Sequence, residues 1–196
     1  AETQLRLMYT RHMKELKLTG NYLKNKKKKS EFEQLAYKNI GSFFSEAEKA
    51  VQLLAESQFQ ERLSYAKKTG ELCHGSYNYH NIIFSNGNTA VTNFDKYKNE
   101  CQISDLYQFM RKILEKYDWD IQTAYKMMEE YDKIKPVSDT ERALLAALFA
   151  FPEKFWKVMN YYFNSNKAWI PPKTKEKLEK VVQQNEKRQK FLETLL

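Results

Sequence analysis

The segment LCHGSYNYHNIIFSNGNTAVTNFD, residues 72–95, interrupts a sequence that is otherwise patterned as helix. It contains the pair Asn86-Gly87, and β-prone residues lie on both sides of that pair. Asn-Gly between two such runs is the strongest short-range signal for a tight hairpin turn. The sequence therefore predicts a mainly α-helical protein with one small β-hairpin, whose strands cover Ile82–Phe84 and Thr89–Phe94.

Helical periodicity fills both sides of this segment. The clearest helix runs from Phe32 to Leu54, where apolar residues recur at three- and four-residue spacing and the other face is polar. Shorter helices are expected near residues 3–18 and 58–68, with a break at Thr19-Gly20-Asn21. Five more are expected after the hairpin, the third starting at a Ser138-x-x-Glu141 capping box. They lie near residues 103–117, 121–131, 138–149, 152–162 and 174–195.

The composition fits one globular domain over residues 1–196, since 42% of positions are apolar and 30% are charged. The longest apolar stretch, Ala143–Phe151, is about half as long as a membrane span requires, so no membrane partner is expected. Cys73 and Cys101 have no Cys or His partner at zinc-site spacing and are expected to be reduced core thiols. The five glycines are isolated, which excludes a Gly-rich phosphate loop.

The net charge of +8 makes a nucleic acid a conceivable partner. The lysine run at residues 26–29 has no aromatic residues interleaved with it, however, and such runs are usually solvated loops. A nucleic-acid partner is therefore not expected.

The interrupting segment also carries polar residues at the spacing of a phosphoryl-transfer loop. Kinase-type enzymes place a base Asp five residues before a magnesium-binding Asn, and a hairpin then leads to a second metal-binding Asp. Ser76 stands at the base position, Asn81 at the first metal position and Asn93 at the second. A Ser hydroxyl does not accept a proton near neutral pH, and a neutral amide oxygen binds Mg²⁺ more weakly than a carboxylate. The spacing is kept, but both acidic groups are lost.

The stretch LCHGSYNYHNIIF resembles the His-Gly-Asp-x-x-x-x-Asn loop of aminoglycoside and choline phosphotransferases. With TNFDK at residues 92–96 and DLYQFMRK at residues 105–112, it is more narrowly similar to CotS-type spore-coat proteins, a degenerate branch of that protein-kinase-like superfamily. The resemblance covers nearly the whole chain after the first dozen residues. It implies the fold of the C-terminal lobe of such a kinase.

The resemblance also implies structural roles at three positions. His74 and Gly75 match the family's loop, and Asp105 matches the Asp that begins the following helix and hydrogen-bonds the loop backbone. No catalytic residue and no cofactor are expected, because Ser76 leaves the base position without an acid–base group.

Two substitutes stay open. His80 is the group beside the loop that titrates near neutrality and would be the replacement base. Asp95 would face the same side as Asn93 if the segment were extended, and with Asn81 the two would make a degenerate metal site. The simpler interpretation of Asp95 is a surface or turn carboxylate.

The 73 residues before His74 are patterned as helix almost throughout, so the strand-rich first lobe of a kinase does not fit among them. The chain is expected to be the second lobe alone, without the nucleotide-binding lobe. The apolar face that would meet a first lobe is then exposed or used for self-association.

The resemblance implies a non-catalytic structural or assembly protein of the spore coat, made in the mother-cell cytoplasm and then held among other coat proteins. The alternative is a small-molecule kinase that uses magnesium and ATP. A third hypothesis is a basic nucleic-acid-binding module. Whether the protein is an enzyme stays open, although the altered positions favour a protein without activity.

Overall fold

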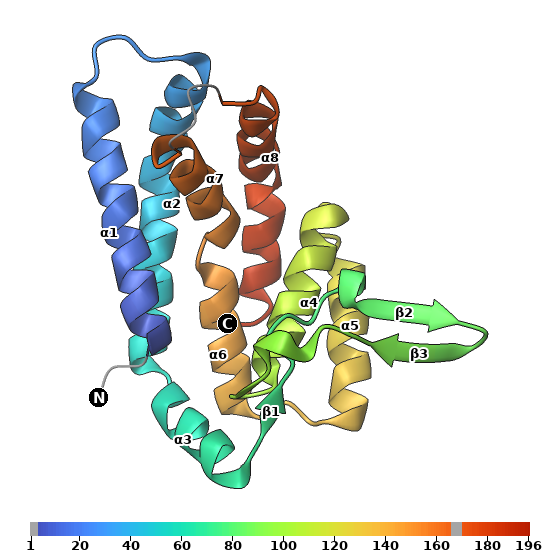
Figure 1. Ribbon diagram of the computed structural model, residues 1–196. Helices are drawn as coiled ribbons and strands as arrows, with labels where there is room; N and C mark the ends of the chain where they lie inside the picture. The colour runs from blue at the N-terminus through green and yellow to red at the C-terminus, as the bar shows by residue number, and fades with distance from the viewer. Residues whose placement is uncertain (1–3, 166–169) are drawn as a thin grey trace.

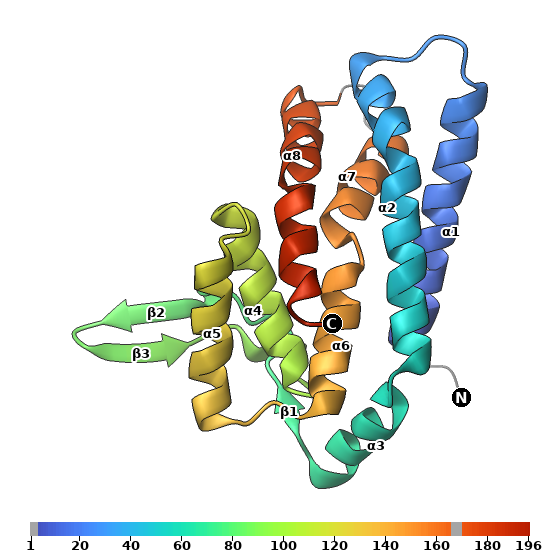
Figure 2. The ribbon, with the colours of Figure 1, turned by 180° about the vertical axis from the view of Figure 1, so that it is seen from behind.

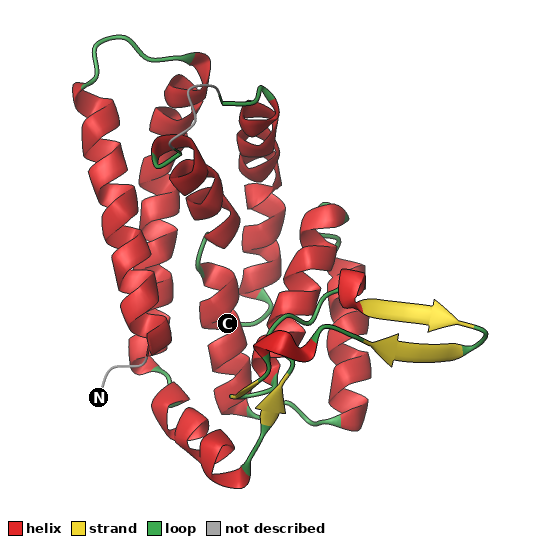
Figure 3. Cartoon of the chain, in the orientation of Figure 1, coloured by secondary structure: helices red, strands yellow, loops and turns green. Residues whose placement is uncertain are grey.

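The computed structural model describes residues 4–165 and 170–196. Most of these residues are helical, and two short antiparallel strand pairs lie in the middle of the chain (Figure 3). The helices are α1 (Gln4–Asn25), α2 (Glu31–Glu56), α3 (Phe59–Thr69), α4 (Ile103–Lys116), α5 (Ile121–Ile134), α6 (Asp139–Ala150), α7 (Glu153–Phe163) and α8 (Lys173–Glu193). The strands are β1 (Leu72–Cys73), β2 (Ile82–Ser85), β3 (Asn88–Val91) and β4 (Lys98–Asn99), and two 3₁₀ helices cover Tyr79–Asn81 and Phe94–Lys96.

The long helices form a bundle, with α4, α5 and the strands standing beside it (Figure 1). Helix α2 contacts α1, α6 and α8, and α4 contacts both α5 and α6. The β2–β3 hairpin points away from the bundle, which is equally clear from behind (Figure 2). Among the described helices, none has the length and apolar character needed to cross a bilayer.

The central position of α2 follows from its sequence. Its buried residues keep the spacing of a single helical stripe and include Phe32, Ala36, Ile40, Phe43, Ala47, Ala50 and Leu54. A capping box formed by Ser30 and Glu33 starts this helix and was not predicted. The capping box predicted at Ser138 and Glu141 is confirmed at the start of α6.

The predicted helix break at Thr19-Gly20-Asn21 is wrong, because α1 continues to Asn25. Leu23 in the added turn is fully buried. Gly20 faces α2, where an added Cβ would lie 3.7 Å from the Ile40 side chain. Burying Leu23 gains about 2 kcal/mol, which outweighs the cost of about 1 kcal/mol for a glycine inside a helix.

The hairpin and its turn are confirmed. Asn86 and Gly87 have φ of 48° and 77°, as a tight hairpin turn requires, and β2 pairs with β3 from Ile82 opposite Val91 to Ser85 opposite Asn88. The second strand ends at Val91 rather than Phe94, because Asn93 turns the chain at a left-handed φ of 63°.

The prediction of a single strand pair is incomplete, since β1 also pairs with β4. Each of these strands has two residues, too few to show a two-residue periodicity in the sequence. This second pair brings together the two ends of residues 74–97, the segment that contains the loop and the hairpin.

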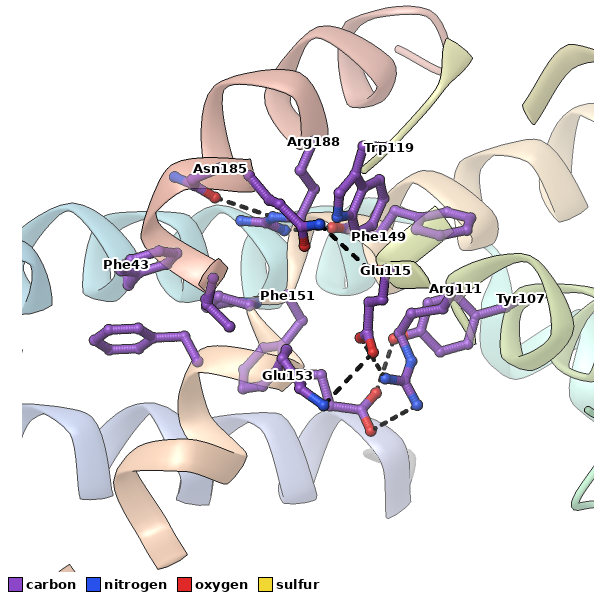
Figure 4. A pocket seen from close by; sticks show the side chains of 15 residues that line it. Phe43, Tyr107, Arg111, Glu115, Trp119, Phe149, Phe151, Glu153, Asn185 and Arg188 are labelled. Atoms are coloured by element: carbon purple, nitrogen blue, oxygen red, sulfur yellow. Dashed lines mark hydrogen bonds and ion pairs between the residues drawn. The ribbon is translucent and has the colours of Figure 1, made fainter. Parts of the chain in front are cut away.

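A small cavity of about 30 Å³ lies where α2, α4, α7 and α8 meet (Figure 4). Arg188 donates to a main-chain carbonyl of α6 at 2.7 Å and is ion-paired with Glu46 of α2. Beside it, Arg111 donates to Glu115 at 2.7 Å and lies 3.4 Å from Glu153. A cavity of this size holds about one water molecule, so the cluster joins helices rather than binding a ligand.

The lysine run lies in the loop between α1 and α2, and the fold places tyrosines beside it. Lys26 Nζ is 5.7 Å from the ring centre of Tyr22, and Lys29 Nζ is 4.9 Å from that of Tyr37. The run itself contains no aromatic residue, as the sequence analysis states, but the fold brings two tyrosines to it. The partners come from the flanking helices and make cation–π contacts rather than alternating with the lysines along the sequence.

Candidate functional site

Asp105, in the first turn of α4, holds the loop that follows β1. Its Oδ2 accepts the backbone N–H of His74 at 2.5 Å, and its Oδ1 accepts that of Gly75 at 3.0 Å. These are the bonds that the resemblance implied for Asp105. Hydrogen bonds to a carboxylate are stronger than those between neutral groups, so they fix the loop to α4.

His74 is buried, and both of its ring nitrogens are used within the site. Nε2 lies 2.8 Å from the carbonyl oxygen of Thr92, which can only accept, so Nε2 carries the proton. Nδ1 then accepts the backbone N–H of Ser76 at 3.1 Å. The neutral imidazole joins the loop to the end of the hairpin, which is a structural arrangement.

Gly75 is required by close backbone contact. Its φ is 74°, and an added Cβ would lie 2.0 Å from the carbonyl oxygen of Lys96. The loop and the 3₁₀ helix Phe94–Lys96 therefore approach so closely that no side chain fits between them.

The three positions that correspond to the kinase base and metal ligands are joined by hydrogen bonds. The buried Asn81 donates its Nδ2 to the carbonyl oxygen of Ser76 at 2.8 Å. Because that carbonyl can only accept, Asn81 Oδ1 faces the opposite way, toward Asn93. Asn93 Nδ2 donates to this oxygen at 2.8 Å. The oxygen that would ligate a metal ion is thus bonded to an amide N–H.

The segment after Asn93 is not extended, so Asp95 does not share a face with Asn93 and is instead an exposed turn carboxylate, which was the simpler interpretation. Asn93 has left-handed backbone angles, and Asp95 lies in the exposed 3₁₀ helix that follows. His80 is also exposed, with its ring centre 4.1 Å from that of Tyr79. Within residues 4–165 and 170–196, no three His, Cys, Asp or Glu side chains are grouped so that they would hold a metal ion.

A cluster of charged residues under the loop was missed by the sequence analysis. Arg62 of α3 donates to Glu71 and to Glu141, each at 2.7 Å, and Lys135 donates to Glu71 at 2.7 Å. Burial alone would raise the pKa of both glutamates, but hydrogen bonds, including those from Arg62, hold each pKa below its ordinary value. Glu141 and Lys135 lie more than 60 residues from their partners in the chain, so no spacing in the sequence indicates the cluster.

Both cysteines are buried free thiols. Burial raises the pKa of Cys73 far above its usual range and that of Cys101 to about 11. Because the thiolate is the reactive form, neither residue is suited to act as a nucleophile near neutral pH.

A pocket of about 400 Å³ opens beside the loop, between the base of the hairpin, α4 and the end of α5. We call it the loop pocket. Its apolar lining comes from Leu72, Tyr77, Val91, Phe94, Leu106, Phe109 and Ile134, and its polar lining from His74, Gln102, Asp105 and Lys135. Tyr131 also lines it, and burial raises the pKa of its hydroxyl to about 12. This volume lies within the range of small-molecule pockets, about 300–1,000 Å³.

The helical core, the Asp-held loop and the following hairpin define the class of protein. They form the C-terminal lobe of a protein-kinase-like, phosphotransferase fold. The crystal structure of an aminoglycoside phosphotransferase from Alicyclobacillus acidocaldarius matches with a TM-score of 0.90 at 19% sequence identity. The match covers 99% of this chain and 58% of that chain, and it establishes the fold.

The family follows from the sequence. The family model described as "Spore coat putative kinase YutH" matches residues 4–195, and the chain belongs to this family. Spore coat protein S of Bacillus subtilis (strain 168) is 20% identical over 166 residues, which cover 84% of this chain and 47% of that protein. The chain thus spans about half the length of this relative. The predicted kinase-like spore-coat family is confirmed.

Proposed function

We propose that this protein is a non-catalytic structural or assembly protein of the spore coat. Its membership of a spore-coat family and its similarity to spore coat protein S support the location. On this proposal it is made in the mother-cell cytoplasm and then held in the coat by other coat proteins. The observation that carries the non-catalytic part is the hydrogen bond between Asn81 and Asn93.

That bond places an N–H group of Asn93 where a magnesium site needs an oxygen atom. A metal site needs oxygen atoms directed at the cation. Here Asn93 directs an N–H at the oxygen of Asn81, and the amide orientation is fixed in turn by the Ser76 carbonyl. The residues present therefore do not fit a magnesium ion held at these two positions.

The base position adds a second deficit. A positioned general base contributes about 10²–10⁴-fold to a rate, and Ser76 does not supply one. Because the metal ligands are also lost, we expect the rate of phosphoryl transfer to be far below that of a competent kinase.

The alternative function is a small-molecule kinase that uses magnesium and ATP. The family's description includes a kinase, and the fold is shared with an aminoglycoside phosphotransferase. Such an activity requires His80 to serve as base or Asp95 to serve as metal ligand. It also requires the Asn81–Asn93 bond to open.

Fluorescent fusions in sporulating cells of the source organism test the proposal. We expect the wild-type fusion to localise to the coat, and Ser76→Ala and His80→Ala to localise equally well, because neither residue has a catalytic task. Gly75→Val is the matched control, since it disrupts the same loop by a steric clash and should reduce localisation. A wild-type protein that stays diffuse in the mother cell, or a folded Ser76→Ala variant that fails to reach the coat, would contradict the proposal.

A further inference from the structure

Basic side chains from two separate parts of the chain gather at one end of the helical bundle. The loop between α1 and α2 lies there with the first turn of α2, and α8 begins at the same end (Figure 1). An ion pair links the two parts, since Lys175 Nζ of α8 lies 2.5 Å from Glu31 Oε2 of α2. We call residues 24–33 and 173–177 the basic end.

The basic end carries more than half of the protein's net charge. Its 15 residues include eight lysines and three glutamates, a net charge of +5, whereas the whole chain has a net charge of +8. Lys26 is paired with Glu33. Lys175 is paired with Glu31. Within the described residues, the other six lysines have no carboxylate at ion-pair distance. Like charges this close repel one another, so the cluster costs the free protein stability.

The lysines of α8 lie where a helix favours the opposite charge. Lys173 and Lys175 are in its first turn, and the residue that precedes the helix makes no side-chain capping bond. The N-terminus of a helix is the positive end of its dipole, which favours acidic groups and disfavours cations. The stability of the fold therefore does not explain the basic end, whereas binding to an anionic partner does.

The basic end is far from the start of α1. This helix begins at Gln4, at the opposite end of the bundle (Figure 2). Its 22 residues span about 33 Å. Charged lysine side chains are almost never buried unless they are paired. Any surface that covers the basic end must therefore carry negative charge.

We propose that the basic end binds an acidic segment, rich in Asp and Glu, of another coat protein. Two features favour carboxylates over the phosphates of a nucleic acid. The basic end contains no Arg, the residue whose planar guanidinium suits phosphate recognition. Tyr22 and Tyr37 are exposed beside the loop, but lysines of that loop lie over both rings, so the rings are not open platforms for stacked bases. The choice of a coat protein as the partner rests on the proposed function.

Fluorescence anisotropy with a labelled oligoglutamate peptide tests the surface on the purified protein at its natural length. We expect binding at low salt that weakens as the salt concentration rises, because exposed charges are screened. Lys27→Glu combined with Lys28→Glu should weaken binding about 10-fold or more, since two attractions become two repulsions. Lys67→Glu combined with Lys68→Glu is the matched control, because these lysines are exposed in the last turn of α3 and the change in net charge is the same. It should weaken binding less than about threefold, since these charges lie far from the basic end and are screened.

Lys173→Glu tests the other part of the basic end and should weaken binding about threefold or more. All variants should keep the wild-type circular dichroism. A wild-type protein that does not bind the peptide, equal losses in the two double variants, or tighter binding of a DNA oligonucleotide of equal charge would overturn the inference.

Localisation in sporulating cells separates this surface from the proposed function. A protein that does not bind the peptide but reaches the coat overturns the surface and leaves the function standing. A protein that binds the peptide but never reaches the coat contradicts the function and the choice of a coat partner, but not the acidic ligand.

Discussion

Replacing Asp105 by Ala should destabilise the fold through two unsatisfied donors. The carboxylate accepts the backbone N–H groups of His74 and Gly75, at 2.5 and 3.0 Å. A buried donor left without a partner costs about 1–3 kcal/mol. The loop cannot turn outward to reach water, because the His74 ring is bonded to Thr92. We therefore expect a loss of about 2–4 kcal/mol, which corresponds to roughly 4–16 °C in melting temperature for a chain of this size.

Urea unfolding followed by circular dichroism measures this loss. Asp105→Asn keeps one acceptor in place and should lose about half as much free energy. Asp120→Ala is a control, because Asp120 caps α5 through an exposed hydrogen bond to Thr123 N–H at 2.8 Å and should cost about 1 kcal/mol. An Asp105→Ala protein as stable as the wild type would refute the role of this carboxylate in holding the loop.

Three further outcomes are expected from stability measurements. Gly75→Ala should cost more than about 2 kcal/mol, whereas Gly87→Ala, at a similar φ of 77° but in open space, should cost about 1 kcal/mol; equal losses in urea unfolding would remove the steric argument. Arg188→Met should cost about 3 kcal/mol by leaving the half-buried Glu46 without its charged partner, and the double variant with Glu46→Met should recover much of it; a double variant no better than the single would contradict this pairing. Glu71 and Glu141, which accept from Arg62, have pKa values below their ordinary value of 4.5. They therefore stabilise the fold above pH 4.5, and this stabilisation is lost as the pH falls below that value. In urea unfolding the free energy of unfolding should fall less steeply over that pH range in Arg62→Met than in the wild type, and an equal fall in both would contradict the role of Arg62.

Local signals in the sequence were enough to predict most of the helices and the hairpin. The apolar stripe of α2 and the Asn86-Gly87 turn each act within a few residues, so periodicity and turn chemistry report them directly. The prediction of a break at Gly20 failed because the burial of Leu23 in the core is a tertiary effect.

In the candidate site, too, the sequence indicates the local features and misses those that depend on tertiary contacts. The spacing of Ser76, Asn81 and Asn93 identified the loop, but the hydrogen bond between the two amides is a feature of the three-dimensional structure alone. The left-handed turn at Asn93 separates it from Asp95, and an extended reading of the sequence cannot anticipate that turn. The Arg62 cluster joins α3 to Glu71 before β1, to Glu141 of α6 and to Lys135 after α5, and these tertiary contacts leave no signal in the sequence.

The most direct measurement is magnesium-dependent ATP binding and turnover by the purified protein at its natural length. The closed Asn81–Asn93 pair predicts no turnover above buffer for the wild type. Ser76→Asp combined with Asn93→Asp restores both acidic groups, which act on different parts of one transition state, and is the simple change expected to raise Mg-ATP affinity. Robust phosphoryl transfer by the wild type, abolished by His80→Ala or Asp95→Ala, would contradict the non-catalytic proposal and establish a kinase.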